Sequence, residues 1–498
     1  MVHDYKRITK QIGVSYFFTI LTFILSPLLV ILLTRTLTVS EYGIFSIFSA
    51  TISTLYSILL FGFPTFIITK FPSFDKSVRV KSIFSIVFSE VIFLMVILTI
   101  LFVPFIKRNI LFYLKLESYF VEFQLTLIIT ALSVIFLLFS SYVTANRKLE
   151  FSSFIDFCFN GLWIIFVFIF IFFFKYSNII TILSLWLIGI FVSLIILLIY
   201  LKEDIILFFT KLRKISLNPL KAALSFGILI IPITISSWII TVSDRYLLSY
   251  FHGKEAVGIY TLSYSLVLII LTFSTVVSNI IYPYLVKAWV ENKNQQILFN
   301  AQLKYSLMII IPAIVGLFIL REQIITLFSG PKYLAGSSAI SILIIFPLFA
   351  SLINVALSNL LIRGKTKLIA LIFLSGASMN IILNFLLIPR WAINGASLAT
   401  VLSYLFMFLL FYLICKKQFL WDFKFLRIGQ IVTASALMGL ALIVINPQIY
   451  LTKIATIIMG GIIYFILLFL LRVFVNQEKL IILSFVPKVL QNIFKIKK

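Results

Sequence analysis

The chain has 498 residues, of which 62% are hydrophobic and only 11% are charged, and its formal net charge at pH 7 is +25. A soluble domain needs about a quarter of its residues charged to cover its surface, so this composition excludes a water-soluble fold. Apolar runs long enough to cross about 30 Å of hydrocarbon recur along the whole chain. The sequence therefore predicts an all-α integral membrane protein.

The first apolar run follows a polar, basic segment and has no small-residue cleavage site, so we expect it to be retained as the first membrane helix. The last stretch, 480–498, is too short and too charged to span, and is expected to lie on the cytoplasmic surface as an amphipathic tail. Between them we predict about fourteen membrane-spanning helices, at 12–34, 44–68, 82–106, 120–143, 151–174, 178–200, 222–243, 257–285, 303–328, 339–362, 368–389, 393–415, 428–446 and 450–474.

The positive charge lies mainly in the gaps between the apolar runs. This placement is typical of topology signals and of contacts to anionic lipid head groups, not of nucleic-acid binding. With the N-terminus inside, 30 of the 41 basic residues fall in cytoplasmic segments or at the cytoplasmic ends of the adjoining spans, and cytoplasmic loops are where lysine and arginine accumulate. We therefore expect a multi-pass protein of the cytoplasmic membrane with both termini cytoplasmic, membrane lipids as partners and no nucleic acid.

A short motif occurs at the start of both the second and the eighth predicted spans. Thr38–Ile47 and Gly253–Leu262 each place an acid before a glycine, an isoleucine, an aromatic residue and a hydroxyl residue, at an offset of 215 residues. A second pair, Asn146–Leu149 and Lys365–Leu368, repeats at an offset of 219 residues. Six spans separate the copies, so both copies have the same orientation and are related by an axis along the membrane normal.

This repeat predicts two six-helix lobes around a central cavity, the geometry that alternating access requires. The predicted N-lobe is 1–213 and the predicted C-lobe is 214–424. Two further helices and the cytoplasmic tail, in 425–498, lie outside the repeat.

Ionisable residues inside the spans are candidates for function, because burying a charge in hydrocarbon is costly. Asp156 lies about two turns into the fifth span, with Asn160 one turn further on the same face. Glu90 lies near the middle of the third span. We expect Asp156 and Glu90 to face the central cavity; a structural hydrogen-bonding site is the alternative for each.

Further polar groups lie at the ends of spans or at mid-depth in the second lobe. Asp244 and Arg245 end the seventh span as an adjacent pair, and Arg35 ends the first span. For Arg35, a charged side chain that reaches the membrane interface is the simpler interpretation. The polar groups at mid-span in the second lobe are amides: Asn279, Asn354, Asn380 and Asn384.

No metal site or cofactor is expected. The two histidines, His3 and His252, have neither metal-ligand nor catalytic-triad spacing, and Cys158 and Cys415 lie in or beside apolar runs. The chain has no ATPase module, so energy for transport must come from an ion gradient, the membrane potential, consumption of the substrate or a partner.

Three segments resemble one superfamily, the multidrug, oligosaccharidyl-lipid and polysaccharide exporters. Asn380–Thr400 contains an asparagine, an apolar run, a proline and then a Gly-Ala segment ending in Ala-Thr, which is similar to that group's signature. Leu33–Gly43 and Ser243–Tyr260 resemble its polysaccharide exporter branch. The resemblance covers essentially the whole chain.

The resemblance implies a flippase, not an enzyme, that moves an oligosaccharide linked to a polyprenyl diphosphate for surface polysaccharide assembly. Arg35 and Arg245 would then hold the diphosphate through charge-assisted hydrogen bonds. Asp156 and Glu90 would couple transport to an ion, and a polysaccharide polymerase or ligase is a further candidate partner. The remaining cavity residues would contact the sugar hydroxyls: Asp244, Asn160, Asn279, Asn354, Asn380 and Asn384.

Two alternatives share this fold. A cation-coupled multidrug exporter usually has twelve spans, so the two extra spans and the basic bias favour a lipid-linked substrate. A flippase for the peptidoglycan lipid precursor would be expected to have a paired-arginine cavity, whereas this sequence shows only isolated arginines. A membrane glycosyltransferase or ligase is a third alternative of another class, but it would need a large catalytic loop, for which the gap 201–221 leaves little room.

Overall fold

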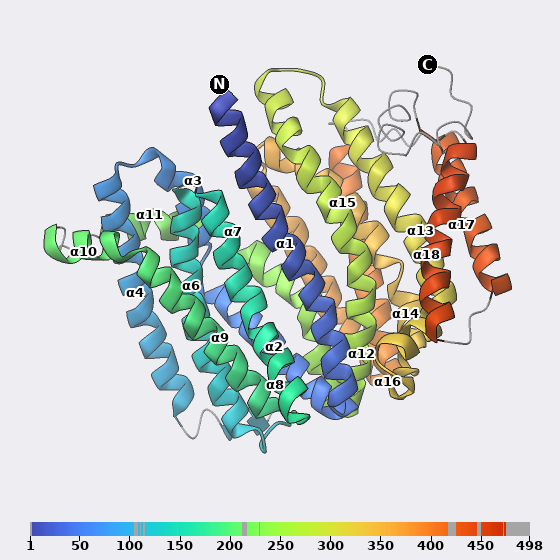
Figure 1. The fold of residues 1–498 in the computed structure, drawn as a ribbon, viewed down its shortest axis with the longest axis horizontal. Coiled ribbons are helices and arrows are strands. Elements are labelled where there is room, and N and C mark those ends of the chain that lie inside the picture. Colours follow the sequence, from blue (N-terminus) through green and yellow to red (C-terminus); the bar gives the residue numbers. More distant parts are fainter. Residues whose placement is uncertain are drawn as a thin grey trace. The chain divides into compact units, whose positions relative to one another are not determined.

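Every regular element in the described part of the chain is a helix (Figure 1), as the composition predicts. The chain divides into two compact units, and α12 (Ile231–Val290) and α16 (Thr366–Cys415) contribute residues to both. The computed structural model describes residues 2–103, 108–109, 111–112, 115–146, 148–211, 217–228, 230–416, 425–445, 450–471 and 473–474.

Unit 1 comprises residues 1–263, 328–339 and 365–407. Besides the shared helices, it contains α1 (Val2–Thr36), α2 (Val39–Leu59), α3 (Phe63–Lys70), α4 (Lys76–Phe102), α6 (Phe120–Ala145), α7 (Leu149–Phe157), α8 (Trp163–Phe174), α9 (Ile179–Tyr200), α10 (Lys202–Lys211), α11 (Leu217–Gly227), a π-helical turn at Cys158–Leu162 and short 3-10 turns at Phe71–Ser73 and Pro331–Tyr333.

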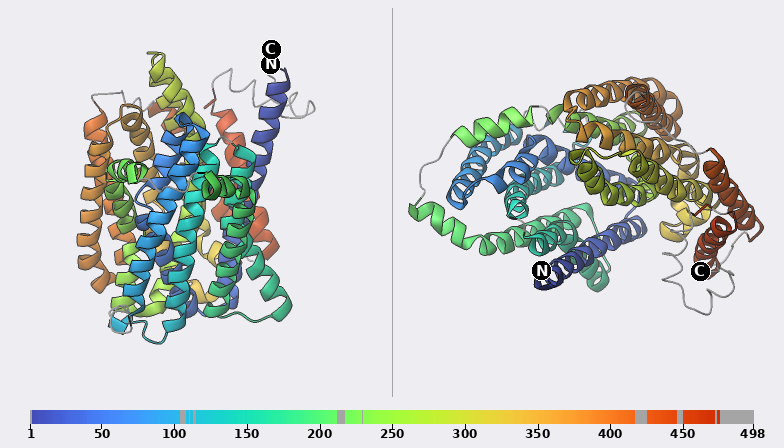
Figure 2. Two further views of the ribbon diagram at one scale, coloured as in Figure 1. Left: turned by 90° about the vertical axis from the view of Figure 1, so that its left-hand side faces the viewer. Right: turned by 90° about the horizontal axis from the view of Figure 1, so that it is seen from above.

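Helix α6 is the centre of packing in the first part of unit 1. It packs against α2, α3, α4 and α9, while α1 lies along α7 and α8 (Figures 1 and 2). Small hydroxyl residues on α6, such as Thr126, Thr130 and Ser133, donate to carbonyls one turn earlier in the same helix. Their polar groups are therefore satisfied without a partner helix, and their small size lets neighbouring helices approach closely.

Unit 2 comprises residues 264–327, 340–364 and 408–498. Helices α17 and α18 pack on α13 through a cluster that includes Met308, Leu320, Met438 and Leu468. At this contact the Tyr464 hydroxyl donates to the Met308 carbonyl over 2.8 Å, which satisfies the polar end of a buried ring. Besides parts of the shared helices, the unit contains α13 (Gln296–Phe328) except its last residue, the second half of α14 (Gly336–Leu343), α15 (Phe346–Ile362), α17 (Phe425–Ile445) and α18 (Tyr450–Leu470).

Several of the predicted spans have different boundaries in the structure, and two of the differences matter for the site. The span predicted at 44–68 is broken into α2, which ends at Leu59, and α3, because Phe61 and Gly62 between them have positive φ angles of +46° and +72°. The span predicted to start at 222 starts instead at Ile231, because residues up to Gly227 form the separate helix α11. It then continues past the predicted end at 243, so Asp244 and Arg245 lie inside a helix rather than at its end.

Eleven of the described helices are long and apolar enough to cross a membrane, judged by length and composition. Two of these, α12 and α16, are each interrupted, at Gly253 (φ +81°) and at Ala392 (φ +45°). A shorter apolar stretch, Ala455–Leu470, lies in α18. The protein is thus a multi-pass, all-helical membrane protein. The number fourteen and the division into lobes stay predictions, and the predicted tail at 480–498 lies outside the described residues.

Candidate functional site

A buried carboxylate in α12 is the centre of a polar network in unit 1. The side chain of Asp244 is 1% exposed. Its Oδ1 accepts from the main-chain N–H of Arg245 over 2.8 Å, and its Oδ2 accepts a short hydrogen bond from the Tyr260 hydroxyl. The same hydroxyl lies 3.3 Å from Thr400 Oγ1 in α16. This Asp244 network, made by Asp244, Tyr260 and Thr400, connects the two parts of α12 on either side of Gly253 with α16.

An amide cluster adjoins the network through Ser243. Asn384 Nδ2 donates to Asn380 Oδ1 over 3.0 Å, and the Ser243 hydroxyl donates to the same oxygen over 3.3 Å. Asn380 in turn donates to the Ser403 hydroxyl over 3.3 Å. Asn384 Oδ1 is buried and has no hydrogen-bond partner among the described residues. The structure therefore brings three predicted site residues, Asp244, Asn380 and Asn384, into one region.

The two predicted diphosphate ligands lie in different surroundings. Arg245 is half-buried in α12, next to Tyr246, whose hydroxyl lies 2.6 Å from Thr51 Oγ1 in α2. Arg35 is exposed at the end of α1, where its Nε donates to the Phe328 carbonyl over 3.0 Å. Lys332 donates to the nearby Leu37 carbonyl over 2.6 Å. Arg35 thus belongs to a set of contacts that hold the α1–α2 connection to residues 328–332.

The two predicted ion-coupling acids also differ. Asp156 is exposed in the last turn before the π-helical turn; its Oδ1 accepts from the Ser140 hydroxyl over 3.2 Å. Asn160 is exposed as well and donates to the Asp156 main-chain carbonyl over 2.9 Å. Glu90, in contrast, is 3% exposed, and its Oε1 has no hydrogen-bond partner in the described structure. A π-helical turn beside Asp156 fits a functional position, since such turns often occur at functional sites.

The two predicted amides of unit 2 flank a polar contact that the sequence analysis missed. Asn279 is exposed in α12, and Asn354 is half-buried in α15. Between these helices, the fully buried Gln302 donates to Ser278 over 3.0 Å and to Ser358 over 3.4 Å. Gln302 was missed because the span was predicted to start at 303, which left this residue in a polar gap.

The two copies of the repeated motif lie directly against each other within unit 1. Ser46 Oγ and Thr261 Oγ1, which correspond at the offset of 215 residues, are 3.0 Å apart. A side chain on Gly43 would collide with the Lys254 carbonyl, and one on Gly258, its counterpart, would collide with the Val39 carbonyl. Val39 and Lys254 are themselves separated by 215 residues. The contact, called here the repeat crossing, is therefore symmetric and depends on two glycines.

Replacing Gly43 by alanine should destabilise the protein by about 1–3 kcal/mol, because the added methyl group has no space beside the Lys254 carbonyl. The measurement is thermal unfolding in detergent. Gly461→Ala is the matched control, since a methyl group there meets nothing within 4 Å. Equal melting temperatures for the two variants would contradict the close contact.

Comparison with known proteins places the chain in a family. The family described as polysaccharide biosynthesis protein matches residues 8–289, which is more than half of the chain. An uncharacterized membrane protein of Methanocaldococcus jannaschii is 29% identical over 188 residues, covering 37% of each chain. A probable low-salt glycan biosynthesis flippase, Agl15 of Haloferax volcanii, is 24% identical over 197 residues, covering 39% of this chain and 42% of the relative.

The chain therefore matches about two-fifths of the length of these curated relatives. Among solved structures, the lipid II flippase MurJ in an inward closed conformation is similar over 91% of this chain and 98% of its own, with a TM-score of 0.74 and 20% identity. This likeness concerns the fold. The sequence match over more than half of the chain shows that the protein belongs to the polysaccharide biosynthesis protein family.

Proposed function

We propose that the protein is a flippase that moves a polyprenyl-diphosphate-linked oligosaccharide across the cytoplasmic membrane by alternating access. Membership of the polysaccharide biosynthesis protein family supports a role in glycan assembly. The similarity to a probable glycan biosynthesis flippase supports the same substrate class. The relative from Haloferax volcanii is named a probable flippase, and the similar solved structure is that of a lipid II flippase, which supports a transport role.

The observation that carries the proposal is the repeat crossing. Alternating access needs two pseudo-equivalent parts that touch on one side of the membrane and can separate there. Ser46 and Thr261 provide such a contact between equivalent positions, on the side that the charge distribution predicts to be outside. The crossing contains two close glycine–backbone contacts and the Ser46–Thr261 hydroxyl pair, whose hydrogen bond contributes only about 1 kcal/mol net.

The substrate would need donors for its diphosphate and both donors and acceptors for its sugars. Arg245 is the proposed diphosphate ligand, because a guanidinium binds phosphate oxygens with two parallel hydrogen bonds. The amide cluster offers Asn384 Oδ1 as an acceptor for a sugar hydroxyl. In the present conformation Asp244 is engaged by Tyr260, so it acts on substrate only if that bond breaks; its role as a ligand stays a proposal.

Asp156 is the proposed ion-coupling acid, since an exposed carboxylate at mid-span is tolerated when it faces water or a cation. Asp156→Asn should flip substrate at a rate that no longer rises when an ion gradient is imposed. Rates in proteoliposomes with and without the gradient measure this. Glu322→Gln, which removes an exposed acid of α13, should respond as wild type. An intact gradient response in Asp156→Asn would assign coupling to another group.

The proposed substrate is tested with a fluorescent polyprenyl-diphosphate oligosaccharide in proteoliposomes, comparing wild type with Arg245→Glu and Arg245→Lys. We expect wild type to flip the lipid, Arg245→Glu to lose at least tenfold in rate and Arg245→Lys to retain part of it. Full activity of Arg245→Glu would exclude Arg245 as a ligand. Gradient-driven efflux of an organic cation, or flipping restricted to the peptidoglycan precursor, would favour the alternative transporters of this fold.

A further inference from the structure

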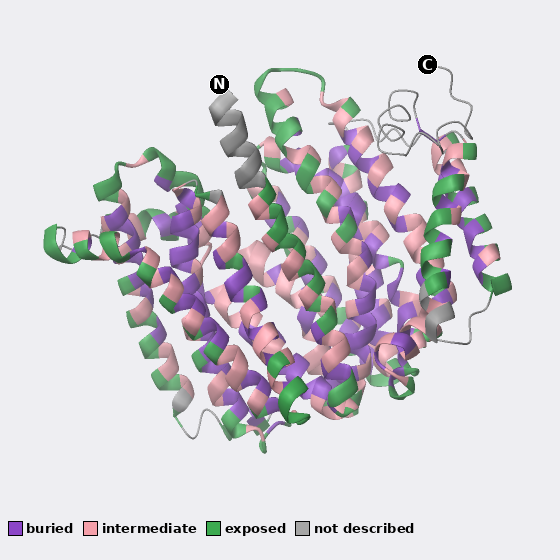
Figure 3. Cartoon of the chain, in the orientation of Figure 1, coloured by how far each residue is buried: buried purple, intermediate pink, exposed green. Residues whose placement is uncertain are grey.

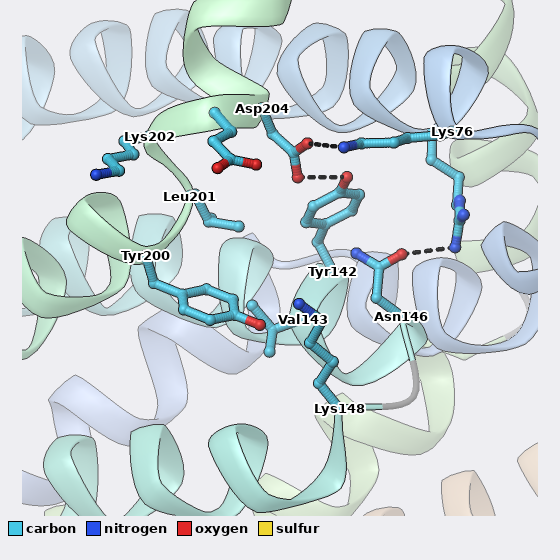
Figure 4. Close-up of a pocket in the computed structure, with 11 residues that line it drawn as sticks. Lys76, Tyr142, Val143, Asn146, Lys148, Tyr200, Leu201, Lys202 and Asp204 are labelled. Atoms are coloured by element: carbon cyan, nitrogen blue, oxygen red, sulfur yellow. Dashed lines mark hydrogen bonds and ion pairs between the residues drawn. The ribbon is translucent and has the colours of Figure 1, made fainter.

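A basic pocket of about 450 Å³ lies in unit 1 where α4, α6, α9 and α10 meet (Figure 4). Segments 69–81, 144–150 and 201–221, all predicted to be cytoplasmic, supply most of its walls. Six charged side chains line it: Lys76, Arg79, Lys148, Lys202, Glu203 and Asp204. The four cations outnumber the two acids, so the pocket has an excess of positive charge.

Two of the pocket's cations, Arg79 and Lys148, form no salt bridge with a carboxylate among the described residues. Asp204 is already neutralised, because its Oδ1 lies 3.4 Å from Lys76 Nζ and its Oδ2 accepts from the Tyr142 hydroxyl over 3.0 Å. Arg79 Nη1 donates to a neutral acceptor, Asn146 Oδ1, over 2.6 Å. Arg79 Nε is buried and has no hydrogen-bond partner in the part of the chain that the structure describes. A buried donor without a partner is uncommon in a native protein and indicates a missing acceptor.

Lys148 is the second of these cations. Its ammonium group lies 5.1 Å from the centre of the Tyr200 ring. Figure 4 shows the Lys148 side chain beside Val143, and both residues line the pocket together with Asn146. The hydrogen bond with the Tyr200 hydroxyl raises the pKa of Lys148, so the group is positively charged at neutral pH. An arginine and a lysine that form no salt bridge with a described carboxylate are a suitable pair of ligands for a phosphate group.

The surroundings of the pocket indicate that this phosphate belongs to a lipid. Helix α10 runs across the direction of α4 and α9 (Figure 1), and much of its surface is exposed (Figure 3). Phe208 anchors it by stacking on Phe84, with ring centres 4.5 Å apart. Ile206 and Phe209 remain 60% and 59% exposed. A short helix with charged residues in its first turn and bare apolar residues beyond lies naturally at the boundary between head groups and acyl chains.

We propose that the basic pocket binds the phosphate of a membrane lipid head group, with Arg79 and Lys148 as ligands and the lipid chain lying along Ile206 and Phe209. The group that the pocket binds is a phosphate monoester, a phosphate diester or a diphosphate carried on a lipid. Its source is either an anionic phospholipid of the bilayer or the diphosphate of the transported carrier. The proposal depends on the pocket alone and does not require that the protein be a flippase.

The test is binding of fluorescent short-chain phosphatidylglycerol to delipidated, full-length protein in detergent, followed by anisotropy. Lys148→Gln and Arg79→Gln should each weaken binding about fivefold, which corresponds to about 1 kcal/mol for one lost charge near a lipid phosphate. Lys148 is exposed, so its variant should fold even if Arg79→Gln, which loses the bond to Asn146, does not.

The matched control is Lys365→Gln/Lys367→Gln, which removes two exposed charges from another predicted cytoplasmic segment. It should bind as wild type; equal weakening in the control would show a general charge effect and overturn the proposal. Competition with polyprenyl diphosphate and with inorganic phosphate identifies the source. Tighter binding of polyprenyl diphosphate assigns the site to the carrier, and equal or weaker binding assigns it to bilayer phospholipid. Inorganic phosphate binding as tightly as either lipid would overturn a lipid site.

Discussion

Oxidation of a Ser46→Cys/Thr261→Cys variant should stop flipping, and reduction should restore it. The two hydroxyl oxygens are 3.0 Å apart, so cysteine sulfurs at these positions can form a disulfide with little movement of the backbone. A covalent bond across the repeat crossing would hold the two copies of the motif together and prevent the outer side from opening. We expect at least a tenfold loss of flipping, measured in proteoliposomes before and after reduction.

The background for this experiment carries Cys158→Ala and Cys415→Ala, which removes both native thiols. Ser274→Cys/Ser351→Cys is the matched control: these hydroxyls are 2.9 Å apart, buried, and both within the predicted C-lobe. A cross-link inside one lobe should leave flipping nearly unchanged. Full activity of the cross-linked Ser46–Thr261 pair would show that the crossing does not open during transport.

Asp244→Asn and Tyr260→Phe should each lower the free energy of unfolding by about 1–3 kcal/mol. Tyr260→Phe leaves the buried carboxylate without its donor, and Asp244→Asn leaves only one acceptor oxygen for two donors, the Tyr260 hydroxyl and the Arg245 N–H. The double variant should lose clearly less than the sum, since the second substitution removes a group whose partner has already changed. Unfolding in detergent, followed by heat or denaturant, measures the coupling.

Tyr464→Phe is the control for this cycle. Its hydroxyl is also buried and also makes one hydrogen bond, to the Met308 carbonyl in unit 2. Combined with Asp244→Asn, it should give additive losses, as expected for independent sites. Additivity between Asp244 and Tyr260 would contradict a network around Asp244.

Composition was sufficient to predict the helical, membrane-spanning fold class. The high apolar content required helices, because only intrahelical hydrogen bonds or a closed barrel satisfy the backbone in lipid. The offset of 215 residues identified Ser46 and Thr261 as equivalent positions, and in the structure their hydroxyl oxygens lie 3.0 Å apart, a contact that the sequence did not predict. The break at Phe61 and Gly62 was not predicted, because hydropathy averages over a window and does not detect two residues with a positive φ.

The site was predicted less completely, because hydropathy indicates depth but not direction. Asp244 was placed at the end of a span, where a charge reaches water; the helix instead continues to Gly253 and buries it against Tyr260. The partners Tyr260 and Thr400 are far apart in the sequence, and no local pattern connects them. The basic pocket was overlooked for a similar reason: Arg79 and Lys148 were counted only as topology signals in separate loops.

The most direct test of the central claim is flipping of a fluorescent polyprenyl-diphosphate oligosaccharide by the purified wild-type protein in proteoliposomes. Dithionite bleaches only the probe in the outer leaflet, so flipping appears as loss of the fraction protected inside. We expect almost complete bleaching in proteoliposomes that contain the protein and about half in protein-free vesicles. Protection that stays at the protein-free level for several such lipids, with the protein folded and correctly inserted, would contradict the account.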